Sequence, residues 1–509
     1  MGNDVLEVAI VGAGFSGLGM AIRLLKAGIS NFRIFEKAGE VGGTWRDNTY
    51  PGCACDVPSQ LYSYSFEPNP DWSHEYGRQP EIQRYLLHCT EKYGLRSRIR
   101  FHSEITGAQF DEAAGEWVLR LNEGESVRAR VVVSARGPFA GESMPAIEGA
   151  DSFQGIRMHT ARWNDGVALR GKRVALIGTG ASAVQVGPAI APEVAELTVF
   201  QRTPPWILPR PDRAITVQEK ALNRALPPAM KVRRLGMYWF HELSAPFLIL
   251  QHDWFKRPPQ ELARAHLRRS VKDRALRTKL TPRYKFGCKR VLLSSDWYPM
   301  LQRDNVRLID EGVTRITEKG ILTRDGVEHA FDVLVYATGY KVPLTEAPFA
   351  IHGLGGRTLG ERFKDGAEAY KGMATAGFPN LFFLVGPFTG PGHQSVIAYA
   401  EAQMDYACQA ILYRRQRRLK YVDVKREREA RFVREMDWRS QFTVWTSGCA
   451  SWYLSPNGRN NALYPGYNVE YRMRLLRFDP EDYELVAGDG AQVRAGLRDH
   501  VRTWLTALA

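Results

Sequence analysis

Cysteine is scarce in this sequence, with six residues among 509, at positions 53, 55, 89, 288, 408 and 449. Such a sparse distribution does not form the disulfide framework of a small secreted domain. Cys53 and Cys55 follow a Cys-x-Cys spacing rather than the Cys-x-x-Cys of thioredoxin-type redox centres. We therefore interpret both as packing residues.

Long hydrophobic runs are also missing. The most apolar window, residues 235–250, is interrupted by His241, Glu242 and Pro246, and it is too short to cross a bilayer. It is typical of a core or interfacial helix. The N-terminus is acidic and leads directly into a strand, which excludes a signal peptide, and it has no myristoylation motif. We expect a cytoplasmic protein, and the sequence gives no firm evidence for a membrane partner.

The chain has no long block of one charge, although its formal net charge is +14. Lys and Arg are scattered, and basic stretches such as 264–277 are most simply solvated helix faces. Anionic cofactors would themselves favour a positive field, so we do not expect a nucleic-acid partner. The hydrophobic fraction of 44% is ordinary for a globular protein, and the length suits about three domain-sized units.

Residues 5–37 carry the pattern of a dinucleotide-binding β-turn-α-β unit. An apolar strand is followed by Gly12-x-Gly14-x-x-Gly17, an apolar helix and a second strand that ends at Glu36. The glycines permit a tight turn and close approach to a pyrophosphate at the helix N-terminus. Glu36, 24 residues after Gly12, suits a ribose 2′-hydroxyl and would repel a 2′-phosphate. No metal-ligand pattern accompanies the unit, and we expect none.

A second such unit begins at Arg173, with Gly178-x-Gly180 and Ser182 at its turn. The same 24-residue step from Gly178 leads to Arg202 instead of an acid. A guanidinium matches the geometry of a phosphate group, so the second site is expected to hold NADP(H) and the first an adenosine without a 2′-phosphate.

The rest of the chain suggests that the first cofactor is FAD. A long Gly-, Pro- and aromatic-rich loop at 41–59 has room to follow an extended cofactor, and the apolar segments 331–340 and 378–387 are typical of buried strands that lead into glycine turns.

Between 208 and 280 the pattern is helical, with Pro227-Pro228 and Pro258-Pro259 as expected breaks. The predicted fold class is α/β, with two Rossmann-like dinucleotide-binding domains and a helical insertion in the NADP domain. The expected domains are 1–145 (FAD, N-terminal part), 146–370 (NADP, with the insertion at about 208–280) and 371–509 (FAD, C-terminal part).

The connector Phe153-x-Gly155-x-x-x-His159-x-x-x-Trp163 resembles the fingerprint of type I Baeyer-Villiger monooxygenases, a class B flavin-dependent monooxygenase family. The family pattern has Pro or Asp after the Trp, where this chain has Asn164. A second departure is Arg136, at a position where the family usually has a small residue. The resemblance extends over nearly the whole chain.

The resemblance implies an FAD- and NADPH-dependent enzyme (EC 1.14.13) that converts a ketone to an ester or lactone with O₂ through a C4a-peroxyflavin. Arg290 would stabilise the anionic peroxide, Asp56 would position Arg290, and Lys289 would join Arg202 and Thr203 around the 2′-phosphate. Trp452 would lie on a loop over NADP and the substrate, and His159 and Trp163 would couple the domains. The remaining cofactor-binding residues implied are Gly43, Thr44, Trp45, Asp47 and Tyr62.

Two alternatives stay open at the level of sequence. A flavin N- or S-oxygenase is disfavoured by Trp163 and by the Lys289-Arg290 pair. An NADPH:acceptor reductase would usually show a Cys pair or a partner-binding module. We expect a monomer or weak homo-oligomer with a small-molecule ketone as substrate. The aromatic content of the insertion hints at a bulky apolar substrate, while linear, cyclic, aromatic and steroid-like ketones all remain candidates.

Overall fold

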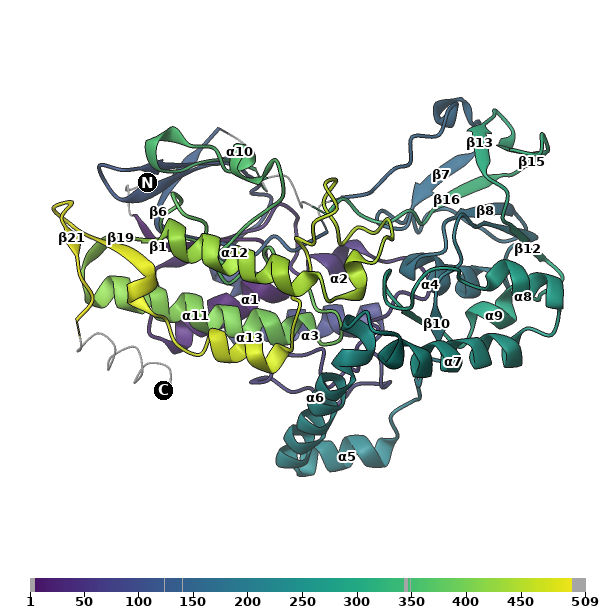
Figure 1. The fold of residues 1–509 in the computed structure, drawn as a ribbon, viewed down its shortest axis with the longest axis horizontal. Helices are drawn as coiled ribbons and strands as arrows, with labels where there is room; N and C mark the ends of the chain where they lie inside the picture. The colour runs from purple at the N-terminus through teal and green to yellow at the C-terminus, as the bar shows by residue number, and fades with distance from the viewer. Residues whose placement is uncertain (1–4, 123, 140, 343–346, 348, 497–509) are drawn as a thin grey trace.

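The chain forms two lobes, each built on its own sheet (Figure 1). The computed structural model describes residues 5–122, 124–139, 141–342, 347 and 349–496. The first four residues, which entered the argument against a signal peptide and a myristoylation site, lie outside this part. In the described residues, no helix is both long enough and apolar enough to span a bilayer.

The first lobe contains a sheet whose strands are mostly parallel, with one antiparallel section. Its strands, in spatial order, are β17 (Ala350–His352), β4 (Ile105–Asp111), β5 (Glu116–Leu121), β6 (Ser126–Ser134), β1 (Leu6–Val11), β2 (Phe32–Phe35) and β3 (Ile99–Arg100), and β18 (Leu381–Phe383) also pairs with β6. Strand β1 is the buried apolar strand expected before the glycine turn, and α1 (Phe15–Lys26) follows that turn. The first β-turn-α-β unit is therefore confirmed.

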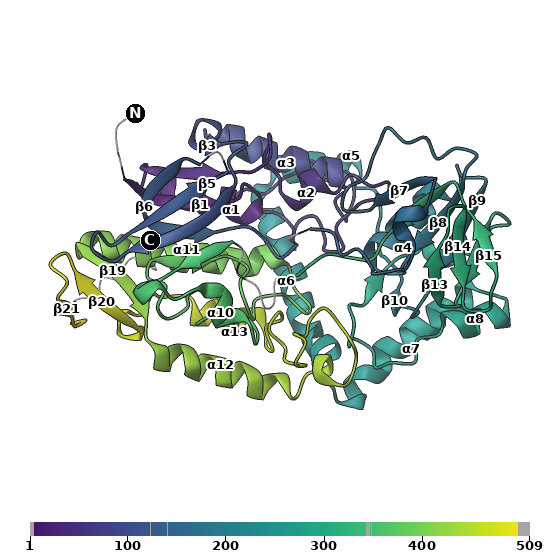
Figure 2. The same cartoon turned by 90° about the horizontal axis from the view of Figure 1, so that it is seen from above.

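The second lobe carries a fully parallel sheet. Its strands, in spatial order, are β12 (Val306–Ile309), β9 (Glu196–Phe200), β8 (Arg173–Ile177), β16 (Val333–Tyr336) and β7 (Ile156–His159). Helix α4 (Ala181–Ile190) begins directly after the second glycine turn, as predicted. Seen from above, the two sheets lie at opposite ends of the molecule, and the segments that join them cross its middle (Figure 2).

Four helices make up the expected insertion: α5 (Val217–Ala225), α6 (Pro227–Ile249), α7 (Asp253–Ser270) and α8 (Arg274–Leu280). Pro227 and Pro228 separate α5 from α6 because proline suits the first turn of a helix, where its missing N–H has no partner. The break predicted at Pro258-Pro259 is wrong, since both prolines lie inside α7. Buried Ala263 and Leu267 hold that helix against the lobe despite the lost hydrogen bonds.

The C-terminal segment returns to the first lobe. Helix α11 (Val396–Gln416) is buried along most of its length and packs against α1, while α12 (Arg426–Ser440) and α13 (Asn468–Arg474) lie outside it. Strands β19 (Leu419–Val424), β20 (Tyr483–Ala487) and β21 (Gln492–Val493) form a small antiparallel sheet. Strand β17 already pairs with β4, so the chain rejoins the first sheet before residue 371, where we expected the boundary. The domain limits otherwise stay a prediction.

Candidate functional site

The first glycine turn, which follows β1, is packed too closely for a side chain at Gly12 and Gly17. A Cβ at Gly17 would lie 1.9 Å from the carbonyl oxygen of Gly12, and one at Gly12 would lie 2.9 Å from that of Ala135. Gly14 faces the second glycine loop, because a Cβ on Gly43 would be 3.4 Å from the Gly14 Cα. The turn therefore offers bare backbone at the N-terminus of α1, which is what a pyrophosphate requires.

Glu36 lies at the end of β2, beside this turn. Its buried carboxylate accepts hydrogen bonds from the backbone N–H groups of Ala13 at 2.8 Å and Ala38 at 3.0 Å. The Arg46 guanidinium pairs with the same carboxylate at 2.9 Å. These contacts fix a negative charge at the position where the unit is expected to hold a ribose.

The loop after β2 brings the other expected FAD residues together. Gly43 has a positive φ of 53° and precedes the short helix α2 (Thr44–Asp47). The Trp45 indole N–H donates to the Tyr62 hydroxyl at 3.1 Å, and Asp47 pairs with Arg46. Bare glycine backbone, a fixed acid and aromatic walls fit an extended flavin dinucleotide.

The second glycine turn, at the end of β8, has the same close packing of glycine against a backbone carbonyl. Gly178 has φ of 114°, and a Cβ there would lie 2.5 Å from the Ala337 carbonyl oxygen. A Cβ on Gly180 would meet nothing within 4 Å, so this side of the turn is open. Ser182 lies in the first turn of α4, and the Thr203 carbonyl accepts a hydrogen bond from the Thr179 hydroxyl at 3.0 Å.

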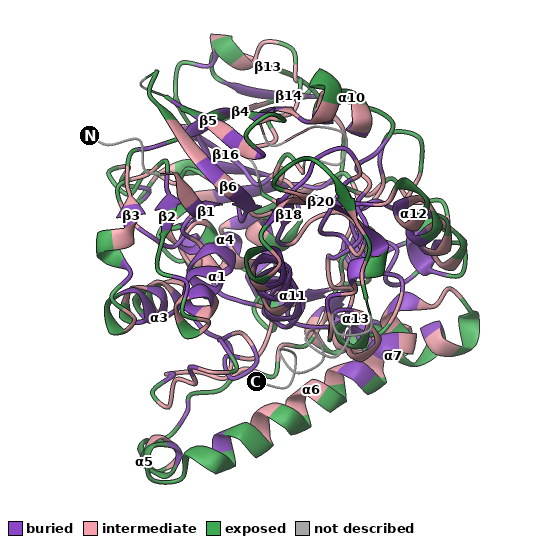
Figure 3. Ribbon diagram, turned by 90° about the vertical axis from the view of Figure 1, so that its left-hand side faces the viewer, coloured by how far each residue is buried: buried purple, intermediate pink, exposed green. Residues whose placement is uncertain are grey.

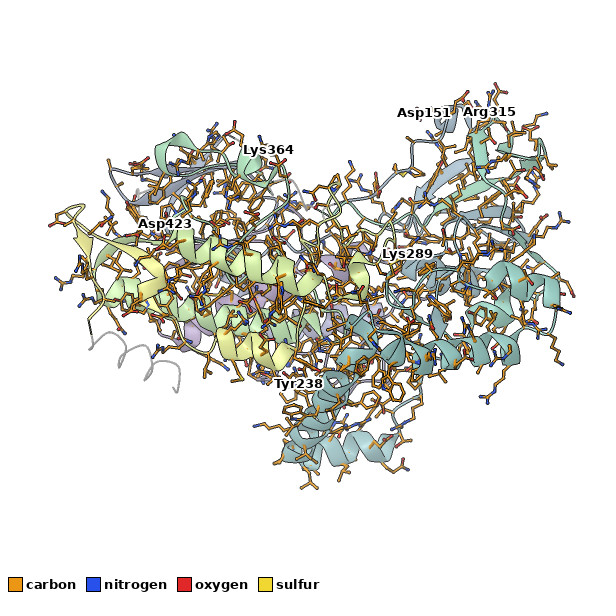
Figure 4. All side chains as sticks on the ribbon, viewed as in Figure 1. Asp151, Tyr238, Lys289, Arg315, Lys364 and Asp423 are labelled. Atoms are coloured by element: carbon orange, nitrogen blue, oxygen red, sulfur yellow. A yellow bond between two sulfur atoms is a disulfide. The ribbon has the colours of Figure 1, made fainter. Side chains whose placement is uncertain are left out.

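Two cations meet beside the second turn without a matching anion. Arg202 follows β9, and Lys289 comes from the segment after the insertion, between the two lobes (Figure 4). Burial, and then the charge of Arg202, lower the pKa of Lys289. Neither cation forms an ion pair within the described part of the chain. The pair fits the 2′-phosphate of NADP, which would relieve the repulsion between the two charges.

Arg290 and Asp56 form an ion pair across the two lobes. The Arg290 Nε donates to the Asp56 carboxylate at 3.1 Å, and a second guanidinium nitrogen contacts the same oxygen. The Asp56 charge holds the pKa of Arg290 above its usual range. The Arg290 side chain stays 41% exposed, so it is a permanent cation with a face left open for another group.

Sequence reasoning gave Tyr453 no role and missed a disulfide beside this pair. Tyr453 is buried next to Trp452, with ring centroids 4.5 Å apart, and burial raises the pKa of its hydroxyl while Arg290 opposes the rise. Cys288, next to Lys289 and Arg290 in the chain, is bonded to Cys449 on the segment that leads to Trp452. The covalent link ties the two segments together. No spacing signal in a single sequence could have paired cysteines 161 residues apart.

Helix α6 reaches the same region through a buried polar cluster that the sequence did not indicate. Glu242 accepts hydrogen bonds from the His393 ring at 3.0 Å and from the backbone N–H groups of Asn468 at 3.2 Å and Val469 at 3.1 Å. The ring of His241, the residue before Glu242, contacts the His393 carbonyl oxygen at 3.0 Å. The insertion is thereby fixed to the loop that follows β18.

The residues of the expected fingerprint line the edge of the second sheet. Phe153 is in the apolar core, and a Cβ on Gly155 would lie 2.6 Å from the Asp332 carbonyl oxygen. His159 is buried at the end of β7, 3.3 Å from the Thr338 hydroxyl, and burial lowers its pKa. Trp163 packs against the main core. These contacts suit a neutral His159 that connects the end of β7 to the segment of Thr338.

The expected packing role of Cys53 and Cys55 agrees with their placement. Both thiols are free and buried, and burial raises the pKa of Cys53 to about 11. Burial likewise raises the pKa of Cys55. Neither thiol would ionise at neutral pH, so neither is suited to disulfide exchange.

Comparisons with known proteins agree with this geometry. The family model described as pyridine nucleotide-disulphide oxidoreductase matches residues 9–232. A Baeyer-Villiger monooxygenase of Streptomyces coelicolor is 43% identical, with 97% of this chain and 95% of that protein covered. The solved structure of OTEMO in complex with FAD and NADP has a TM-score of 0.86 at 27% identity, covering 95% of this chain and 100% of that one. Oxidized steroid monooxygenase bound to NADP has a TM-score of 0.82 at 32% identity, covering 93% and 97%. The chain belongs to the Baeyer-Villiger monooxygenase family.

Proposed function

We propose that this enzyme inserts one oxygen atom of O₂ beside the carbonyl group of a small-molecule ketone, giving an ester or lactone, with Arg290 as the catalytic cation. The chain is an NADPH-dependent flavoprotein monooxygenase with FAD and NADP(H) as cofactors. The observation that carries the assignment to Arg290 is its ion pair with Asp56, which follows the first dinucleotide unit in the chain, whereas Arg290 follows the second.

Each cofactor has residues suited to hold it. Gly12, Gly14 and Gly17 would receive the FAD pyrophosphate, with Glu36 at its ribose. Gly178 and Gly180 would receive the NADP pyrophosphate, with Arg202, Thr203 and Lys289 around the 2′-phosphate. When bound, FAD reduced by NADPH supplies the chemistry that activates O₂.

Arg290 contributes a positive charge that does not depend on pH in the working range. An anion in a site shielded from bulk water needs such a partner, and a preorganised cation stabilises developing negative charge without reorganising. Asp56 holds the guanidinium in place and keeps it protonated. Trp452 and Tyr453 help to exclude water from this side of the site.

The substrate is tested with purified, FAD-loaded protein, NADPH, O₂ and a panel of ketones: cyclohexanone, 2-decanone, acetophenone and progesterone. Mass spectrometry should find a product 16 mass units heavier than at least one ketone, formed in proportion to the NADPH consumed. Oxidation of NADPH with hydrogen peroxide as the only product for every ketone would contradict the proposal. Location in the cytoplasm and a monomeric or weakly oligomeric state remain predictions.

A further inference from the structure

Helix α6 exposes a continuous apolar stripe. Positions 232, 235, 239 and 243 recur at helical spacing, and Phe240 widens the stripe. These five residues, Val232, Leu235, Trp239, Phe240 and Leu243, are between 45% and 73% exposed. Figure 3 shows α6 along the lower edge of the molecule, with exposed residues along much of its length. Water contact at so many large apolar residues on one face indicates an interaction surface.

The other side of α6 is fixed to the first lobe, so the stripe cannot turn inward. Arg234 donates to the Gln60 carbonyl, and the Tyr238 hydroxyl donates to Asn468 at 3.0 Å. Glu242 is held by the cluster with His393 described above. Tyr238 lies on the underside of the first lobe (Figure 4). The fold therefore presents the apolar stripe in a constant orientation.

The helical insertion that carries this stripe has an excess of positive charge. Residues 208–280, all of which the structure describes, contain sixteen Lys and Arg against six Asp and Glu, a formal net charge of +10 out of the chain's +14. Within that segment, six basic residues have neither an ion pair nor a side-chain hydrogen bond in the described structure: Lys220, Lys231, Arg257, Arg269, Lys272 and Arg274. Trp254, in the first turn of α7, adds a 75% exposed indole next to Arg257. An exposed Trp, Phe and Leu face with surrounding Lys and Arg is typical of helices that lie in a lipid interface.

The acidic residues of the insertion do not offer a complementary surface for a second copy. Glu242 is buried, Asp212, Glu219 and Glu261 pair with arginines, and Asp273 caps α8. Asp253 alone among the six has no such partner in the described residues. Two copies that met at this face would bring like charges together, whereas an anionic lipid surface would attract them.

We propose that α6, with the start of α7, is an interfacial anchor that docks this enzyme onto an anionic lipid surface without crossing it. Apolar side chains of the stripe enter the boundary between headgroups and acyl chains, and the unpaired cations nearest the stripe, Lys231 on α6 and Lys220 on the adjoining α5, contact lipid phosphates. Docking does not depend on the identity of the substrate. Any apolar ketone that dissolves in the lipid phase would then be close to the enzyme.

Vesicle co-sedimentation tests the proposal with the full, FAD-loaded chain. Vesicles of phosphatidylcholine with phosphatidylglycerol should bind the protein about tenfold or more tightly than vesicles of phosphatidylcholine alone, and high salt should release it. The double variant Phe240→Ser/Leu243→Ser should bind the anionic vesicles about tenfold more weakly. Trp438→Ser/Val327→Ser, which also removes one exposed aromatic and one exposed aliphatic residue, should bind like the wild type.

Several outcomes would overturn the proposal. The wild type could fail to bind the anionic vesicles, both double variants could lose binding to the same extent, or Phe240→Ser/Leu243→Ser could bind as tightly as the wild type. Melting temperature and flavin content of each variant show that it is folded. Sedimentation velocity gives a further arm: a wild-type dimer that becomes a monomer in Phe240→Ser/Leu243→Ser would assign the stripe to a second copy and contradict lipid docking.

Discussion

At the scale of single residues, we propose that Arg202 and Lys289 determine which nicotinamide cofactor the second turn accepts. If both contact a 2′-phosphate, Lys289→Ala and Arg202→Ala should each raise KM for NADPH roughly tenfold or more, since a charge-assisted hydrogen bond is lost. KM for NADH should change little because NADH has no such phosphate. Steady-state kinetics with both cofactors measures this. Arg307→Ala, which removes an exposed arginine from neighbouring β12, is the matched control, and an equal effect on NADH would contradict the assignment.

The lowered pKa of Lys289 predicts a pH dependence. Burial and Arg202 favour the neutral amine, so Lys289 loses its proton, and with it the proposed contact with the 2′-phosphate, at a lower pH than an ordinary lysine. KM for NADPH should therefore rise on the alkaline side as pH approaches that lowered value. In Arg202→Ala the rise should move to higher pH because one cause of the lowering is removed, and Lys289→Arg should abolish it. An identical profile in all three proteins would contradict this account.

At the scale of elements, the Glu242 cluster holds α6 to the loop after β18. Glu242→Ala leaves the buried His393 ring and two backbone N–H groups without an acceptor and should lower the free energy of unfolding by about 3 to 5 kcal/mol. Denaturant unfolding at pH 7 measures the loss. The exposed Glu261→Ala on α7 is the control and should change stability little.

The same carboxylate contributes a pH-dependent part of the stability. Burial alone would raise the pKa of Glu242, but its contacts with His393, the Val469 backbone and Gln394 together outweigh burial, and the pKa lies below the usual value of 4.5. Because the folded-state pKa is depressed, the stabilisation is complete above pH 4.5 and is lost as the pH falls through the lower folded-state value. The difference between wild type and Glu242→Ala should shrink over that window. A constant difference would show that Glu242 acts through packing alone.

The disulfide joins two further elements, the segment of Arg290 and that of Trp452. Because Cys288 and Cys449 are bonded, denatured but unreduced protein should show four thiols in a colorimetric titration, and six after reduction. In Cys449→Ser the segment around Trp452 loses its tether and should be cleaved by chymotrypsin several-fold faster. Cys408→Ser, a buried free thiol, should cleave like the wild type. Six thiols before reduction would contradict the link.

At the scale of the whole molecule, local pattern was enough to predict the two dinucleotide units. A glycine turn after an apolar strand is a local requirement, so Gly12 and Gly178 could be identified without a fold. Contacts between segments that are distant in the sequence could not be predicted in this way. The Cys288 disulfide, the Glu242 cluster and the place of Tyr453 depend on how the lobes meet, which no spacing encodes. The proline break at 258–259 failed because packing of Ala263 and Leu267 overrode a local preference.

The central claim is that a permanent cation at position 290, held by Asp56 between two cofactor sites, directs oxygen into a ketone. The most direct measurement is turnover of FAD-loaded wild type, Arg290→Ala and Asp56→Ala with NADPH, ¹⁸O₂ and a ketone that the wild type accepts. Wild type should place one ¹⁸O atom in each ester formed. Arg290→Ala should still oxidise NADPH but should lose ester formation at least a hundredfold, with Asp56→Ala intermediate. Ester with ¹⁸O formed by Arg290→Ala at the wild-type rate would contradict the account.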